Sequence, residues 1–174
     1  MKGVVFNLLE EAVTRGFGED AWEDLIEASG VSGAYTSLGN YSDDEIERLV
    51  AAASAKLGME PNAVLEWFGR AAMPLLKERY AVLFEGHASS RTFILSVNSI
   101  IHPEVRKIYA GAACPFFHMA EEPGGGIAMR YSSSRRMFAL AVGFVRGAAD
   151  LWGDDLAVST PADRPDTLIM AWAP

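Results

Sequence analysis

The sequence predicts an α+β fold, with a helical part over about residues 1–110 and a sheet-containing part over about residues 111–174. In the first part, apolar residues recur three or four positions apart, which is the spacing of an amphipathic helix. The second part instead has short apolar runs on either side of Pro123-Gly124-Gly125-Gly126, a strong turn signal. Because no repeat or low-complexity linker interrupts the 174 residues, we expect one domain.

Three helices are expected at the start of the chain. The first two cover about residues 3–14 and 20–29, and glycine follows each of them. A loop rich in Gly, Ser and Asn then leads to Ser42-Asp43-Asp44-Glu45, a capping box in which the serine hydroxyl and the glutamate carboxylate satisfy backbone donors reciprocally. The third helix therefore begins there and stops at Gly58.

Two further helices contain prolines inside their apolar patterns. The fourth helix starts at Pro61, and Pro74 is expected to kink or divide it, because proline removes a backbone donor and clashes with the preceding turn. The fifth covers about residues 91–109 and is apolar over much of its circumference, which predicts that it is buried. Pro103 is expected to bend this helix just beyond His102.

The remaining elements have the period of a sheet. Residues 115–122 and 127–135 flank the glycine-rich turn and are expected to pair as an antiparallel hairpin. A nearly all-apolar helix follows at about 136–152. Two last strands are expected at about 156–159 and 167–172, so that the helix packs on a mostly antiparallel sheet.

Charge and composition exclude several classes of function. The net charge of -8 should repel the phosphate backbone of nucleic acids. Neither a signal peptide nor an apolar run of about 20 residues is present, so we expect a cytoplasmic protein that does not span a membrane. The single cysteine, Cys114, excludes an internal disulfide and a zinc site made of cysteines.

Two groups of residues are candidates for chemistry. In an extended segment Tyr131, Ser133 and Arg135 share one face, where three donors could hold carboxylates or phosphates. The alternative is a strand end with a solvated arginine. His102 lies in an apolar segment, where a neutral imidazole could ligate a metal or could simply be a hydrogen-bonded core residue.

Taken together, several motifs resemble the H-NOX family of haem-nitric oxide/oxygen binding domains, which are related to the haem domain of soluble guanylate cyclase. The resemblance spans essentially the whole chain, and its most specific part is a Tyr-x-Ser-x-Arg pattern with a histidine some thirty residues before it. The matching segments are Met1-Lys2-Gly3-Val4-Val5-Phe6-Asn7, Ile100-Ile101-His102-Pro103-Glu104-Val105, Gly111-Ala112-Ala113-Cys114-Pro115 and Tyr131-Ser132-Ser133-Ser134-Arg135.

The resemblance implies haem b, with ferrous iron, buried between the helical part and the sheet. His102 would be the axial ligand of the iron. Tyr131, Ser133 and Arg135 would hold the haem propionates, which need partners once they leave water. Pro115 matches the family proline that presses on the porphyrin and distorts it. Zinc is not expected, because the C-terminal cysteines of some family members are missing.

The distal side of the haem decides which gas binds. Oxygen-binding relatives place a tyrosine five residues after the motif arginine, and this chain has Leu140 there. None of the positions that align with the distal pocket carries a hydrogen-bond donor; they are Val5, Leu9, Ala72, Leu76, Leu140 and Phe144. We therefore expect a sensor that binds nitric oxide, and also CO, but excludes oxygen.

Signalling is expected to pass through His102. Nitric oxide would weaken or break the bond between His102 and iron, and the helix at about 91–109 would then be released. Because the chain has no segment of a catalytic type, it is expected to be no enzyme and to report to a histidine kinase or a cyclic-di-GMP enzyme.

Three other functions remain open. A haem enzyme would need distal acid or base groups that this chain lacks. A haem-free interaction domain could use Tyr131, Ser133 and Arg135 to bind a phosphate or carboxylate ligand. An oxygen-binding member of the family is disfavoured by Leu140.

Overall fold

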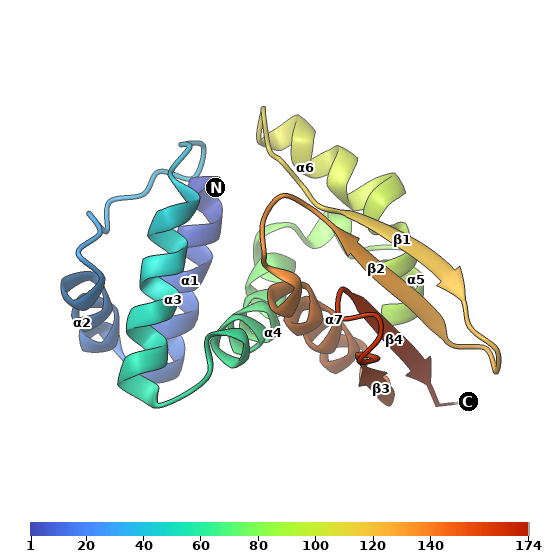
Figure 1. Cartoon of the computed structure of the whole chain (residues 1–174). Helices are drawn as coiled ribbons and strands as arrows, with labels where there is room; N and C mark the ends of the chain where they lie inside the picture. The colour runs from blue at the N-terminus through green and yellow to red at the C-terminus, as the bar shows by residue number, and fades with distance from the viewer. Residues whose placement is uncertain (174) are drawn as a thin grey trace.

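The computed structural model describes residues 1–173, with helices first and the sheet last (Figure 1), so the predicted α+β class is confirmed. The helices are α1 (Gly3–Phe17), α2 (Glu19–Ser29), α3 (Asp43–Leu57), α4 (Pro61–Arg79), η1 (Ala81–Leu83), α5 (Ser90–Ser96), η2 (Val97–Ile101), α6 (His102–Ile108) and α7 (Phe138–Trp152). The strands are β1 (Phe116–Glu121), β2 (Ile127–Ser132), β3 (Leu156–Ser159) and β4 (Thr167–Trp172).

The start of α3 differs from the predicted capping box. Ser42 does cap the helix, since its Oγ accepts from the Asp44 amide at 3.2 Å. Glu45, however, accepts a hydrogen bond from the Tyr35 hydroxyl at 2.8 Å. The glutamate therefore fixes the preceding loop onto α3. A reciprocal capping box occurs instead at Ser89 and Thr92, where α5 begins.

Helix α4 is not divided by Pro74 and continues to Arg79. It crosses α7 closely because glycines face each other at the crossing. A Cβ atom on Gly143 would lie 2.9 Å from the Gly69 Cα. One on Gly147 would lie 2.8 Å from the carbonyl oxygen of Arg70, which is the group that loses its helical donor to Pro74.

The predicted helix at 91–109 is three consecutive segments, and the prediction of a single buried helix is wrong. Segment η2 is a π-helix between α5 and α6. A π-helical turn contains one residue more than an α-helical turn, and each added residue rotates the following side chains by roughly 100° about the helix axis. One apolar face therefore cannot stay buried along the whole of residues 91–109. Leu95, Ile100 and Ile108 accordingly remain 39%, 49% and 45% exposed.

The sheet has the strand order β1-β2-β4-β3 and every neighbouring pair is antiparallel. Phe117 on β1 is opposite Tyr131 on β2. The predicted hairpin is present, but β2 ends at Ser132. Ser133 and Arg135 therefore follow the strand, and the prediction that they share a strand face with Tyr131 is wrong.

Two hydrophobic clusters form the core, and α4 and α7 contribute to both. The first packs α1, α2 and α3 against α4, and the second packs the sheet and α5 against α7. In Figure 1, α1–α3 lie on the left, α4 and α7 in the centre, and the sheet with α5 and α6 on the right. Within residues 1–173, no helix combines the length and the apolar character needed to cross a membrane.

Candidate functional site

His102 is the first residue of α6, and its position is set by the π-helical turn before it. The side chain of Asn98 in that turn forms two hydrogen bonds with the backbone of Phe117 on β1, at 2.6 Å to the carbonyl and 3.2 Å from the amide. The Asn98 side chain thus satisfies the backbone groups of Phe117 that a further strand would otherwise pair with. The His102 ring lies 5.8 Å from the Phe117 ring, so the imidazole lies over this end of the sheet.

The His102 imidazole is neutral and has an unsatisfied polar atom. Its Nδ1 is buried and has no hydrogen-bond partner in residues 1–173. Burial, together with the charge of Arg106, lowers the pKa of His102 to about 4, and the Pro115 carbonyl acts weakly in the opposite direction. A neutral imidazole keeps the lone pair that a metal requires.

Tyr131, Ser133 and Arg135 are brought together by a turn that follows β2. The Tyr131 hydroxyl donates to the Arg135 carbonyl at 3.0 Å, and the Arg135 amide donates to the Ser133 Oγ at 3.1 Å. The Phe117 ring is near both this group and His102, since it lies 5.9 Å from the Tyr131 ring and 5.8 Å from the His102 ring.

The guanidinium of Arg135 contacts the segment that leads into β1 and also α3. Its Nη1 donates to the Ala113 carbonyl at 2.7 Å, two residues before Pro115. Its Nε donates to the Asp43 carboxylate at 2.8 Å. Burial acts to raise the pKa of Asp43, but hydrogen bonds from the Met1 amino group and from Arg135 outweigh it and hold that pKa below its usual value.

The six positions predicted for the distal pocket come from α1, α4 and α7. Leu9, Ala72 and Leu140 are buried in the first core cluster. Val5, Leu76 and Phe144 are partly buried and pack against the same cluster. Leu76 and Phe144 also contact the second cluster, so they lie where the two cores meet. All six side chains are apolar and belong to or pack against the first cluster.

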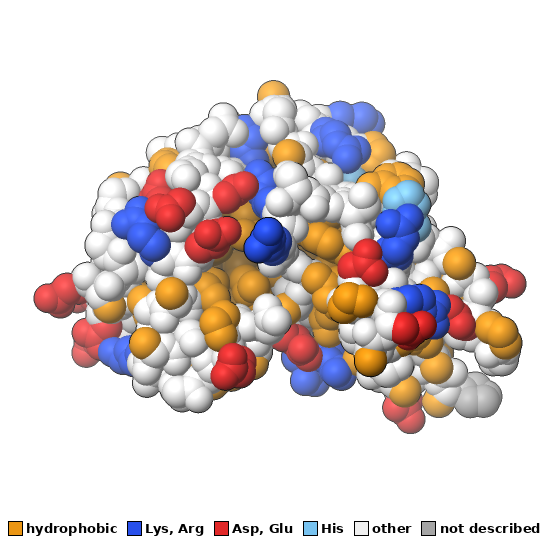
Figure 2. Space-filling view, viewed as in Figure 1, with side chains coloured by type: hydrophobic (Ala, Val, Ile, Leu, Met, Phe, Trp, Pro, Cys, Tyr) orange, Lys and Arg blue, Asp and Glu red, His pale blue; other side chains and the backbone are white. Residues whose placement is uncertain are grey.

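A cavity among the N-terminal helices lies elsewhere. It has a volume of about 370 Å³ and is enclosed by α1, α2, α3 and α4. Leu9 is the one predicted site residue in its lining, and neither His102 nor Arg135 reaches it. Figure 2 shows hydrophobic side chains in a hollow between the helices on the left and the rest of the molecule, with charged groups around it. We place the chemistry at His102, where the donor groups are.

These residues fit a haem group. A buried imidazole nitrogen without a partner can ligate iron. Tyr131 and Arg135, which a hydrogen bond joins, supply a hydroxyl and a cation, and this combination suits carboxylates drawn out of water.

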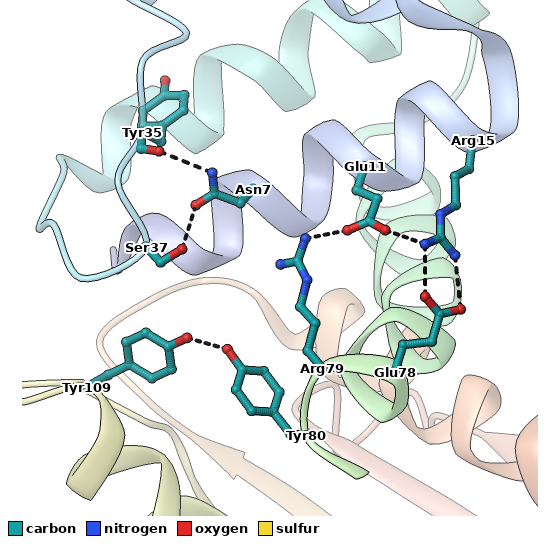
Figure 3. A network of polar contacts seen from close by, with 9 residues as sticks. All are labelled: Asn7, Glu11, Arg15, Tyr35, Ser37, Glu78, Arg79, Tyr80 and Tyr109. Atoms are coloured by element: carbon teal, nitrogen blue, oxygen red, sulfur yellow. Dashed lines mark hydrogen bonds and ion pairs between the residues drawn. The ribbon is translucent and has the colours of Figure 1, made fainter.

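The sequence did not indicate several residues that shape this site. Asn98 and Asp43 act through contacts with residues 19 and 92 positions away, which no local pattern contains. Tyr80, after α4, and Tyr109, after α6, join their hydroxyls in a hydrogen bond, and Figure 3 shows them pointing toward each other. Tyr109 was within the expected helix, but nothing in the sequence paired it with Tyr80.

Comparisons with known proteins agree with the fold. A family model described as Haem-NO-binding matches residues 2–160. An H-NOX protein from S. oneidensis, solved in the Fe(II)NO ligation state, is 27% identical, with a TM-score of 0.91 over 100% of both chains.

Two further structures extend this similarity. An H-NOX domain from Shewanella oneidensis in the Fe(II)CO ligation state is 28% identical, with a TM-score of 0.85 over 99% of both chains. The unliganded Fe(II) H-NOX protein from K. algicida is 24% identical, with a TM-score of 0.85 over 100% of this chain and 97% of that one. The predicted resemblance is thereby confirmed, and the chain belongs to the Haem-NO-binding family of haem-binding gas sensor domains.

Proposed function

We propose that residues 1–174 act as one haem b domain that senses nitric oxide and excludes oxygen. The observation that carries this proposal is the neutral imidazole of His102, whose Nδ1 is buried and has no hydrogen-bond partner in residues 1–173. A ferrous haem, when bound, supplies the iron that takes the gas. His102 would hold the iron, and Tyr131, Ser133 and Arg135 would hold the propionates.

Discrimination between gases rests on the apolar group around Leu140. Bound oxygen is polar and gains stability from a hydrogen-bond donor, whereas nitric oxide binds ferrous haem strongly without one. Leu140, Leu9 and Ala72 offer no donor and keep water out of the cluster. This composition favours nitric oxide and CO over oxygen.

The signal would leave the domain through α6. Release of His102 from the haem would free the first residue of α6. The exposed side chains Ile100, in η2, and Ile108, at the end of α6, lie on this segment. A partner that reads this surface, a histidine kinase or a cyclic-di-GMP enzyme, receives the change. The domain itself performs no catalysis in this proposal.

One spectroscopic experiment tests haem binding and gas selectivity. The absorption spectrum of the reduced protein is recorded without oxygen, then with nitric oxide, and separately in air. We expect a haem spectrum that nitric oxide changes, and no stable complex between ferrous haem and oxygen in air. A stable ferrous oxygen complex would contradict the role of Leu140, and a colourless protein after attempted haem loading would favour the haem-free interaction domain.

A second experiment tests the role of His102 in signalling. His102→Gly with free imidazole added should restore haem ligation but separate it from α6. We expect the partner of this variant to stop responding to nitric oxide. A normal response with imidazole bound would refute transmission through His102.

A further inference from the structure

Asp43 connects the N-terminal helices to the propionate-binding arginine. Its carboxylate lies in the first turn of α3, and its Oδ2 accepts from the Nε of Arg135 at 2.8 Å. Its Oδ1 accepts from the Met1 amino group at 2.7 Å. The Arg135 side chain is only 19% exposed and that of Asp43 is 39% exposed, so water screens this pair less than a surface ion pair.

The guanidinium of Arg135 is held at two of its three nitrogens. Asp43 takes Nε, and the Ala113 carbonyl takes Nη1 at 2.7 Å. These contacts lie at different edges of a planar group and so fix the orientation of the plane. Within residues 1–173, Nη2 forms no hydrogen bond and stays available for a carboxylate oxygen.

We propose that Asp43 is a positioning residue for haem binding, which orients Arg135 toward a propionate and ties α3 to the sheet at the haem edge. This inference rests on the proposed function, because it takes Arg135 to be the propionate ligand. Without the Asp43 carboxylate, Arg135 keeps its charge but is anchored only by the Ala113 carbonyl. The propionate is then held less firmly, and the contact between α3 and the segment after β2 is lost.

Asp44 offers a matched control. It is the next residue in the first turn of α3, so both carboxylates interact similarly with the helix dipole. Asp44 is 67% exposed and accepts from the Nε of Arg48 at 2.9 Å, away from Arg135. Asp43→Asn and Asp44→Asn therefore remove the same charge from the same turn, and only the first reaches Arg135.

The first test measures the haem-loaded protein. The rate of haem transfer to a scavenger protein should rise about tenfold in Asp43→Asn, as expected when a hydrogen bond between charged groups is lost. The Raman band of the propionate bending motion should also shift. Asp44→Asn should change neither. If the two variants lose haem at equal rates with equal propionate bands, the positioning role is refuted.

The second test needs no haem and separates this inference from the proposed function. In the haem-free protein, urea unfolding of Asp43→Asn, Arg135→Gln and the double variant forms a thermodynamic cycle. We expect a coupling that changes the folding equilibrium by about fivefold, and near-additivity when Asp44→Asn replaces Asp43→Asn. If the protein binds no haem but the cycle shows the coupling, the proposed function is refuted and the link between Asp43 and Arg135 stands. If the effects of Asp43→Asn and Arg135→Gln simply add, the link itself is refuted.

Discussion

Replacing Gly143 by alanine should force α4 and α7 apart. The new Cβ atom would lie 2.9 Å from the carbonyl carbon of Glu66 and 2.9 Å from the Cα of Gly69, and closer still to the Glu66 carbonyl oxygen. All three are backbone atoms, so no side-chain rotation can relieve the clash. Ordinary contact begins at about 3.4 Å, so the helices must separate by at least about half an ångström.

The size of the effect follows from two opposing contributions. Alanine favours a helix over glycine by roughly 0.5–1 kcal/mol. Overpacking of a tight interior costs about 1–3 kcal/mol, and this rigid contact belongs near the upper end of that range. We therefore expect a net loss of about 2 kcal/mol, which lowers the melting temperature by about 4–8 °C for a chain of this size.

The assay is urea and thermal unfolding of the haem-free protein, with Gly16→Ala as control. Gly16 is also helical, on α1, but its added Cβ would lie 3.5 Å from the Trp67 side chain, an ordinary contact. The control should gain about 0.5–1 kcal/mol from helix propensity alone. If Gly143→Ala melts at or above the unchanged protein, the close helix crossing does not limit this fold and the reasoning is wrong.

Three further predictions concern the surroundings of His102. The pKa of His102 is about 4 in the folded protein and near 6.5 in the unfolded chain, so between these pH values only the unfolded chain takes up a proton. The urea midpoint of the haem-free protein should therefore fall as the pH is lowered from 6.5 to 4. His102→Gln should reduce this dependence of the midpoint on pH. Asn98→Ala leaves the backbone groups of Phe117 without their partner and should lower the free energy of unfolding by about 1–3 kcal/mol. The control Ser99→Ala removes one hydrogen bond to a helix carbonyl and should lower it by less than about 1 kcal/mol. Equal losses of stability in the two variants would contradict the bridging role of Asn98. Tyr80→Phe and Tyr109→Phe each remove the same hydroxyl pair, so their losses of about 1 kcal/mol should not add in the double variant, and additive losses would show that the pair does not act as a unit.

The sequence predicted those elements whose ends are marked locally. Helix α3 lies between Ser42 and Gly58 as expected, because a capping side chain and a left-handed glycine are both visible in the sequence. The hairpin of β1 and β2 was predicted from its glycine-rich turn. In both cases a few neighbouring residues contain the whole structural signal.

The remaining features depend on contacts between distant segments. The π-turn before His102 coincides with the bonds between Asn98 and Phe117, which helical periodicity cannot reveal. The alternation of Tyr131, Ser133 and Arg135 suggested a strand, but hydrogen bonds among these residues form a turn instead. The Tyr-x-Ser-x-Arg motif therefore pointed to the correct family, but the extended conformation predicted for it was wrong.

The π-turn also determines how firmly the ligand helix is attached. The amide of His102 donates to the carbonyl of Val97, five residues earlier, where a regular helix would bond four residues back. Just beyond it, Pro103 has no amide to donate. The main-chain connection on either side of the imidazole therefore lacks the continuous hydrogen bonding of α7, which has no proline. Hydrogen exchange should be faster in this stretch than in α7, and α6 should be easier to displace than α7.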